Sequence, residues 1–286
     1  MSETPRDISV PTRHQTHWGS HVLKALCWLS GFITVGCLML IVLFICINGI
    51  PHLTPSLFAV KYTTQNVSML HAIINTLTMT ALALLFSVPV GVMGGIYLAE
   101  YAKPGSRLVK VIRVTAETLA GIPSIVYALF GLLAFVVTFK IGISILSGAL
   151  TLAIMTLPLI LRQTEESLLA VPMSYREGSF GLGAGKLRTT VRIVLPVAMP
   201  GILAAVLLSI GRISGETAAL IYTAGTATRI AGLMESGRTL SVHLYQLQQE
   251  GRFIDEAFAV AVVLLVIVVL MNAFSSLIAK KLTTKG

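Results

Sequence analysis

The sequence predicts an all-α polytopic membrane protein with six transmembrane helices. Hydrophobic residues make up 55% of the 286 residues and charged residues only 12%. The mean hydropathy of +0.86 lies outside the range of ordinary soluble domains. The apolar residues are gathered into six separate runs, each close to the roughly 20 residues that an α-helix needs to cross a bilayer.

The six runs are the expected membrane spans. The first, residues 25–47, is longer than the apolar core of a signal peptide, which has about 7 to 15 residues. No small-x-small cleavage site follows it, so we expect it to stay in the protein. Prolines lie within or near the ends of the second, third and fourth runs, where neighbouring helices can satisfy the backbone groups that a proline frees. The remaining runs are 73–98, 115–139, 143–161, 197–223 and 257–279.

Lysine and arginine predict how the spans are oriented. If the N-terminus, the loops after spans two and four, and the C-terminus share one side, that side has fifteen basic residues and the other five. Because basic loops stay in the cytoplasm, we expect both termini there, with cytosolic tails at residues 1–22 and 280–286. This topology accounts for the net charge of +9 without a nucleic-acid partner.

Small residues recur at intervals of four in spans two and five. Such ridges let helices approach closely, so we expect both spans to lie inside a helix bundle. The two ridges are Ser87, Gly91 and Gly95, and Gly211, Gly215 and Ala219.

The outer loops 48–71 and 224–256 are long enough to hold structure, and the second contains a helix-like piece at 240–249. The second loop is either the contact site for a partner outside the cell or a solvated connector.

The sequence argues against an intramembrane enzyme. An aspartyl protease needs paired aspartates in the membrane, but Asp7 and Asp255 both lie outside the spans. A rhomboid-like serine protease needs a serine and a histidine there; Ser214 is present, but no histidine lies well inside a span. No His, Glu and Asp cluster has metal-ligand spacing, and the three cysteines, all in the first span, read as small apolar residues. We therefore expect no catalytic residues and no metal site.

A polar, glycine-rich and basic stretch, residues 177–196, separates spans four and five. It does not match a phosphate-binding loop, because the pattern GxxxxGK[ST] would need glycine at Phe180 and Ser or Thr at Leu187. We therefore expect this chain to bind no nucleotide or other cofactor. Ser174 and Glu177 have the spacing of a capping box, which predicts that Ser174 starts a helix and that the glycines end it.

The same stretch resembles the EAA signature, EAAxxxG(x)9IxLP, of the membrane subunits of binding-protein-dependent ABC importers. The spacing of the signature is kept, while its two alanines are replaced by glycine and serine, which makes the local helix more flexible. The positions concerned are Glu177, Gly178, Ser179, Gly183, Ile193, Leu195 and Pro196. Three further stretches look like the phosphate-specific permeases of this family: LAEYA at 98–102, GIPSIVYALFG at 121–131 and GRISGETAAL at 211–220.

The resemblance covers most of residues 71–279 and implies a type I ABC importer permease (MetI-like) domain there, with a coupling loop at 174–196. Residues 1–70 would hold a cytosolic tail, the first helix and the first outer loop. In that family the coupling loop forms a short helix seated in a groove of the ATPase subunit. The resemblance also implies that the chain is not itself an enzyme and passes inorganic phosphate across the bacterial inner membrane.

The implied partners are a second, homologous permease in a heterodimer, two cytosolic ATPase subunits that hold ATP and Mg, an extracytoplasmic phosphate-binding protein and membrane lipid. Two alternatives stay open at this point. The substrate could be another oxyanion, such as sulfate or molybdate. An ion-coupled secondary transporter or channel would instead predict inverted repeats, and no convincing repeat relates the two halves.

Two charges fall within span five. Arg212 and Glu216 lie roughly 24 to 30 Å along a helix that begins at Pro196, and their i, i+4 spacing would put both on one face. Charges inside a membrane are costly, so the pair is a candidate for the substrate pathway, with Arg212 meeting the anion and Glu216 as its resting partner. The alternative is a salt bridge that neutralises itself and only helps to pack the bundle.

Overall fold

The structure is a computed structural model that describes residues 18–103 and 105–283, and in these residues it contains helices and no β-strand. The outer parts of the two expected cytosolic tails, residues 1–17 and 284–286, lie outside the described residues. The chain divides into two compact units at Ile47 and Asn48. The first unit holds most of α1 (Trp18–Gly49), a helix long and apolar enough to cross a membrane, whose described side chains are largely exposed.

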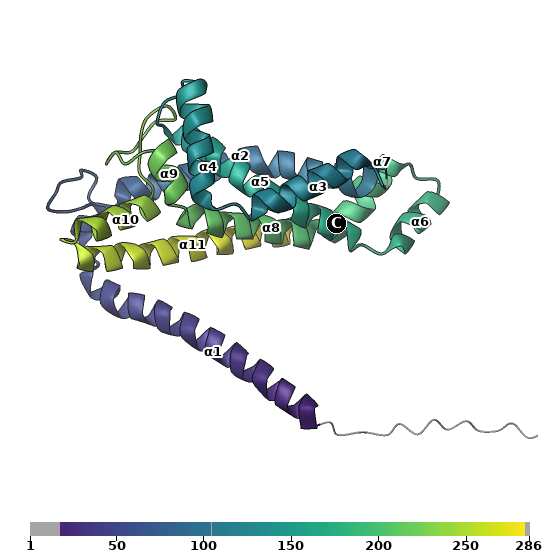
Figure 1. Ribbon diagram of the computed structural model, residues 1–286, viewed down its shortest axis with the longest axis horizontal. Coiled ribbons are helices and arrows are strands. Elements are labelled where there is room, and N and C mark those ends of the chain that lie inside the picture. The colour runs from purple at the N-terminus through teal and green to yellow at the C-terminus, as the bar shows by residue number, and fades with distance from the viewer. Residues whose placement is uncertain (1–17, 104, 284–286) are drawn as a thin grey trace, which may run out of the picture. The chain divides into compact units, whose positions relative to one another are not determined.

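Four long helices build the second unit. α2 (Leu70–Ile96), α5 (Ile145–Leu169), α8 (Leu195–Gly215) and α11 (Ile254–Thr283) lie side by side in Figure 1. α2 packs along α5, α5 along α8, and α8 along α11. Their core is made of apolar side chains, including Met79, Leu152 and Ile213.

Shorter helical segments join these four. Their bounds are Ile50–His52, Pro55–Phe58, Tyr97–Tyr101 (a π-helical extension of α2), α3 (Arg107–Ala120), α4 (Ser124–Gly131) with its π-helical continuation Leu132–Thr138, α6 (Met173–Gly181), α7 (Lys186–Thr189), the π-helical Thr190–Val194, α9 (Ala218–Thr223) and α10 (Leu240–Glu250). α10 confirms the helix expected at 240–249.

The expected third span, 115–139, is not one straight helix. It is divided between α3 and α4, whose axes differ by 105°, so that α4 runs across the direction of α2, α5, α8 and α11 (Figure 1). The break falls at Gly121–Pro123, because Pro123 has no amide hydrogen to donate and disfavours a helical conformation in Ile122 before it. The described residues therefore hold five helices able to cross a membrane, or six if this bent pair counts as one span.

The two ridges of small residues have different surroundings. A Cβ added at Gly91 would lie 2.8 Å from Ile160, and one at Gly95 would lie 2.7 Å from Thr164, so this ridge does allow α2 to approach α5 closely. Span five also lies in the bundle, because α8 packs against α5 and α11, but its ridge does not make the close contact that was expected. Nothing lies within 4 Å of a Cβ added at Gly211 or Gly215, and these two glycines face open space instead of a neighbouring helix.

A buried arginine holds the loops together at the end of the unit where α10 lies. The Arg238 side chain, 3% exposed, donates through Nε to His71 Nε2 at 3.2 Å and through Nη1 to Gln246 Oε1 at 2.5 Å. Its guanidinium lies 4.8 Å from the centre of the Tyr62 ring. His243 is buried beside it, with Nε2 3.1 Å from the Val67 carbonyl. Burial, and next the charge of Arg238, lower the pKa of His243 from 6.5 to about 3.

Candidate functional site

The first candidate site is the glycine-rich loop, which the structure forms as a short helix, α6, and a tight return. The Gly183 amide donates to the Phe180 carbonyl at 2.9 Å, and the Ala184 amide donates to the Ser179 carbonyl at 3.1 Å. These two bonds form a Schellman motif around Gly183, whose φ of +79° is a left-handed conformation that favours glycine. The glycine of the EAA signature therefore ends this helix, as expected.

The predicted capping box is wrong. α6 begins at Met173 with Pro172 as its N-cap, and no side chain caps it. Ser174 is the second residue inside the helix, because Pro172 already supplies the extended backbone from which the helix starts. Glu177 is exposed on α6.

Arg176 fixes α6 to the rest of the domain, a role that no local sequence pattern predicted. It is 8% exposed. Its Nε and Nη2 donate to Glu100 Oε1 at 3.1 and 2.6 Å, and Glu100 lies in the π-helical extension of α2. Its Nη1 and Nη2 also donate to the carbonyls of Val171 and Leu168, both at 2.8 Å. One guanidinium thus joins α6 to α2 and to the C-terminal end of α5.

Two weaker contacts hold the return of the loop. The hydroxyls of Ser179 and Thr189 are 2.8 Å apart, and the Lys186 ammonium lies 5.2 Å from the centre of the Tyr101 ring. Because Lys186–Gly215 forms one continuous helical span, the return of the loop and Arg212 belong to the same element. Among the other signature residues, Ile193 and Leu195 are half-buried and Pro196 is exposed.

The outer surface of the loop exposes several large apolar side chains beside an open hollow. Leu182 is 91% exposed, and a hollow of about 460 Å³ lies beside it. The hollow is lined by residues of α6, of its return and of the start of the next helix, including Tyr175, Gly178 and Arg188. The other exposed apolar side chains here are Met173, Tyr175, Phe180 and Leu187. A patch of this kind is typical of a protein contact surface.

The second candidate site contains Arg212, and the structure separates it from Glu216. α8 ends at Gly215, and Glu216 has an extended backbone, so the two side chains do not share a helical face. Glu216 Oε1 instead accepts a hydrogen bond from the Ala219 amide at 3.1 Å, at the start of α9. Its carbonyl accepts one from the Ser241 hydroxyl at 2.7 Å. Within the described part of the chain no carboxylate pairs with Arg212, so the expected Arg212–Glu216 salt bridge is not formed.

Arg212 lines an open groove of about 810 Å³ whose other lining side chains are uncharged. Leu159 comes from α5, Asn272 from α11, and the rest from α8: Ala204, Leu207, Leu208, Gly211 and Arg212. The bare Cβ position of Gly211 leaves room directly beside the arginine. The groove therefore presents one cation and one amide on an apolar wall.

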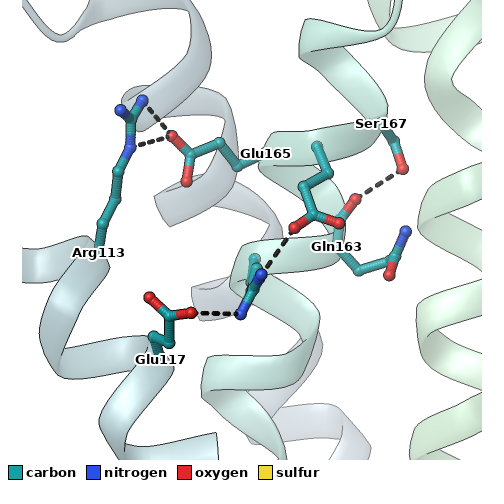
Figure 2. A network of polar contacts seen from close by, with 7 residues as sticks. Arg113, Glu117, Gln163, Glu165 and Ser167 are labelled. Carbon is teal, nitrogen blue, oxygen red and sulfur yellow. Dashed lines mark hydrogen bonds and ion pairs between the residues drawn. The ribbon is translucent and has the colours of Figure 1, made fainter.

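A third polar cluster joins α3 to α5 (Figure 2). Arg113 contacts Glu165 Oε1 through Nη2 at 2.5 Å and Nε at 2.7 Å, while Arg162 contacts Glu166 at 2.8 Å and Glu117 at 3.5 Å. Glu165 is nearly buried, its side chain 7% exposed, whereas Arg113 is half exposed. A cavity of about 240 Å³ lies among these residues. Each charge has a partner, so we assign the cluster to holding α3 against α5. Across the part of the chain that the structure describes, no group of His, Cys, Asp and Glu is arranged to hold a metal ion.

Comparison with known proteins identifies the family. The family described as "Binding-protein-dependent transport system inner membrane component" matches residues 91–284. The probable ABC transporter permease protein YqgI of Bacillus subtilis is 32% identical over 264 residues, which cover 84% of this chain and 89% of that protein. The phosphate transport system permease protein PstA of Pasteurella multocida is 38% identical, covering 73% of this chain and 76% of that protein. PstA 1 of Mycobacterium tuberculosis is 43% identical over 155 residues, which span half of its length.

Solved structures support the fold. The inward-facing MetNI methionine ABC transporter has a chain that matches with a TM-score of 0.57 at 21% identity, covering 75% of this chain and 94% of that one. A chain of a bacterial ABC transporter involved in the import of the acidic polysaccharide alginate matches with a TM-score of 0.57 at 16% identity, covering 92% of this chain and 94% of that one. The helical arrangement, the signature loop and the family match agree, and this chain belongs to the inner-membrane components of binding-protein-dependent transport systems.

Proposed function

We propose that this chain is the permease subunit of an ATP-driven importer of inorganic phosphate in the bacterial inner membrane, with both termini in the cytosol. Its similarity to PstA proteins of Pasteurella and Mycobacterium, which are phosphate transport permeases, supports the substrate. The distribution of lysine and arginine supports the orientation.

The observation that carries the proposal is Arg212 in a groove without a carboxylate. Arginine is suited to an oxyanion, because its planar guanidinium can donate two parallel hydrogen bonds to phosphate. Glu216 accepts from the Ala219 amide and so leaves the arginine open to an anion. The apolar walls offer no further charge, which favours the brief, weak binding that passage through a membrane requires.

Energy would reach this groove through the loop. The exposed apolar side chains of α6 would sit in a groove of an ATPase subunit, and Glu177, Gly178, Ser179 and Gly183 lie on this helix or at its end. ATP and Mg would be bound by that partner, and this chain would bind no cofactor. Since the return of the loop and Arg212 belong to one helical span, motion at the ATPase would move the arginine directly.

The assembly would contain two ATPase subunits, a second permease that is homologous to this chain but different from it, and an extracytoplasmic phosphate-binding protein. One chain then supplies half of the pathway. The groove at Arg212 would become an enclosed passage only when the second permease covers it.

Purification of the tagged complex, followed by uptake of labelled phosphate into proteoliposomes, tests the proposal. We expect an ATPase and a second permease to co-purify, and uptake to need ATP and the binding protein. Competition by sulfate or molybdate at equal concentration would instead assign a different oxyanion. Uptake by this chain alone, without an ATPase, would contradict the proposal and favour a secondary transporter.

A further inference from the structure

Asn272 is the second polar side chain in the Arg212 groove, and its amide has no hydrogen-bond partner. It lies on α11, eleven residues before the end of that helix at Thr283. Its Oδ1 is buried and unpaired, and no other described residue bonds to the amide. A buried polar atom without a partner costs about 1–3 kcal/mol, so an asparagine at an apolar wall is expected to have a use.

The packing of α8 on α11 puts Asn272 at the level of Arg212. The Ser214 hydroxyl on α8 lies 3.9 Å from the Met271 sulfur on α11, which aligns the two helices at these residues. Asn272 follows Met271 and Arg212 precedes Ser214 by two residues, and both line the same groove. The uncharged amide and the guanidinium thus come from two helices to one place.

We propose that the Asn272 amide is a second ligand of the translocated anion, acting together with Arg212. This inference rests on the proposed function. Phosphate near neutral pH carries at least one hydroxyl besides its charged oxygens. Arginine can only donate hydrogen bonds, whereas an amide can donate from Nδ2 or accept at Oδ1, so Asn272 can match either part of the ion. Because neither end of the amide is held by a partner, it can turn over without losing a bond.

A neutral ligand also suits a transport pathway. A second cation would bind the anion more tightly and slow its release, while an amide orients the anion by hydrogen bonds without adding charge. Glu216, the carboxylate nearest to Arg212 in sequence, bonds to the Ala219 amide and does not pair with either ligand.

The test compares Asn272→Leu, Asn272→Ser and Arg212→Ala in the reconstituted complex. We expect Asn272→Leu to lower the maximal rate of phosphate uptake about tenfold, the value of one hydrogen bond to a charged group, with little change in KM. Asn272→Ser keeps a hydroxyl that donates and accepts, so it should retain more uptake than the leucine variant. Ser275→Ala, on the same helix but outside the groove, should transport normally.

Stability measurements separate a ligand from a packing residue. Leucine removes the unpaired buried atom, so Asn272→Leu should unfold at the same or a higher denaturant concentration while it transports less. If Asn272→Leu lost both stability and uptake, and Asn272→Ser lost more of each than Asn272→Leu, the inference would be overturned and Asn272 would be a packing residue. Loss of the second permease from the purified Asn272→Leu complex would overturn it in favour of a subunit contact.

The double variant Arg212→Ala/Asn272→Leu gives a further criterion. If both side chains hold one anion, the double variant should lose less than the product of the two single losses. Normal uptake by Asn272→Leu beside impaired uptake by Arg212→Ala would refute the role of Asn272 alone. Absence of phosphate uptake by the unaltered complex would instead refute the proposed function.

Discussion

Arg176 provides a stringent test of how the loop is anchored, because one side chain makes all the bonds concerned. Arg176→Met removes two contacts to Glu100 and two to the carbonyls of Leu168 and Val171. It also leaves the Glu100 carboxylate, 7% exposed, without its cation. Removal of one partner from a buried ion pair costs about 3–5 kcal/mol, and we expect the free energy of unfolding of the complex to fall by about this amount.

Arg188→Met is the matched control, since Arg188 is exposed on the same loop and forms no ion pair among the described residues. Its free energy of unfolding should stay within about 0.5 kcal/mol of the unaltered protein. Equilibrium unfolding in mixed detergent measures both variants. Arg176→Met combined with Glu100→Gln should recover about 1–3 kcal/mol, because the unpaired carboxylate is then gone. If Arg176→Met were no less stable than Arg188→Met, the proposed anchoring of α6 would be wrong.

Three further predictions concern the glycines and one histidine. Gly183→Ala should lower the free energy of unfolding by about 1–2 kcal/mol and lower the phosphate imported per ATP, because the φ of Gly183 is +79°. Gly185→Ala is the control, since Gly185 has a φ of −74° and equal open space, and it should change neither quantity. Gly95→Val should lower the free energy of unfolding by about 1–3 kcal/mol, since its Cβ would lie 2.7 Å from Thr164, whereas Gly211→Ala should leave the free energy of unfolding unchanged. The pKa of His243 is about 3 in the folded protein, so as the pH falls from 6.5 towards 3 the imidazole is protonated in the unfolded chain but stays neutral in the folded one. Stability should therefore be lost with falling pH, by about 2 kcal/mol between pH 6.5 and 5, and His243→Gln should lack that part of the slope; an unchanged slope would contradict the assignment.

The spans and the loop could be predicted because they depend on local composition. Apolar runs indicated the long helices, and turn chemistry at Gly183 correctly placed the end of α6. The breaks were harder to predict. Gly121–Pro123 carries a known breaking signal, but an apolar run with a central proline can also stay straight in a membrane, where neighbours satisfy the backbone. The 105° bend depends on tertiary packing.

The Arg212–Glu216 pair shows the limit of helical spacing. An i, i+4 interval predicts a shared face only while the helix continues, and α8 stops at Gly215. The Ser214-Gly215 pair was a local signal for such a break. The Glu216 side chain accepts from the Ala219 amide, and its carbonyl accepts from Ser241, which lies 25 residues away.

Two buried arginines were not predicted, because their partners lie far away in the sequence. Arg176 bonds to Glu100, 76 residues earlier, and Arg238 to His71, 167 residues earlier. From sequence, each arginine was only a basic loop residue, because no local pattern distinguishes a buried arginine from a solvated one. The division into residues 1–70 and 71–279, and the site roles of the loop, stay predictions.

The role of Arg212 in the anion pathway is tested most directly by the initial rate of ATP-dependent phosphate uptake into proteoliposomes that hold the complex with Arg212→Ala. Arg107→Ala is the charge-matched control, since Arg107 is exposed on α3, away from the groove. With equal assembly of both variants, Arg212→Ala should lose most of the uptake and Arg107→Ala should transport normally. Uptake by Arg212→Ala at the rate of the unaltered complex would contradict this role.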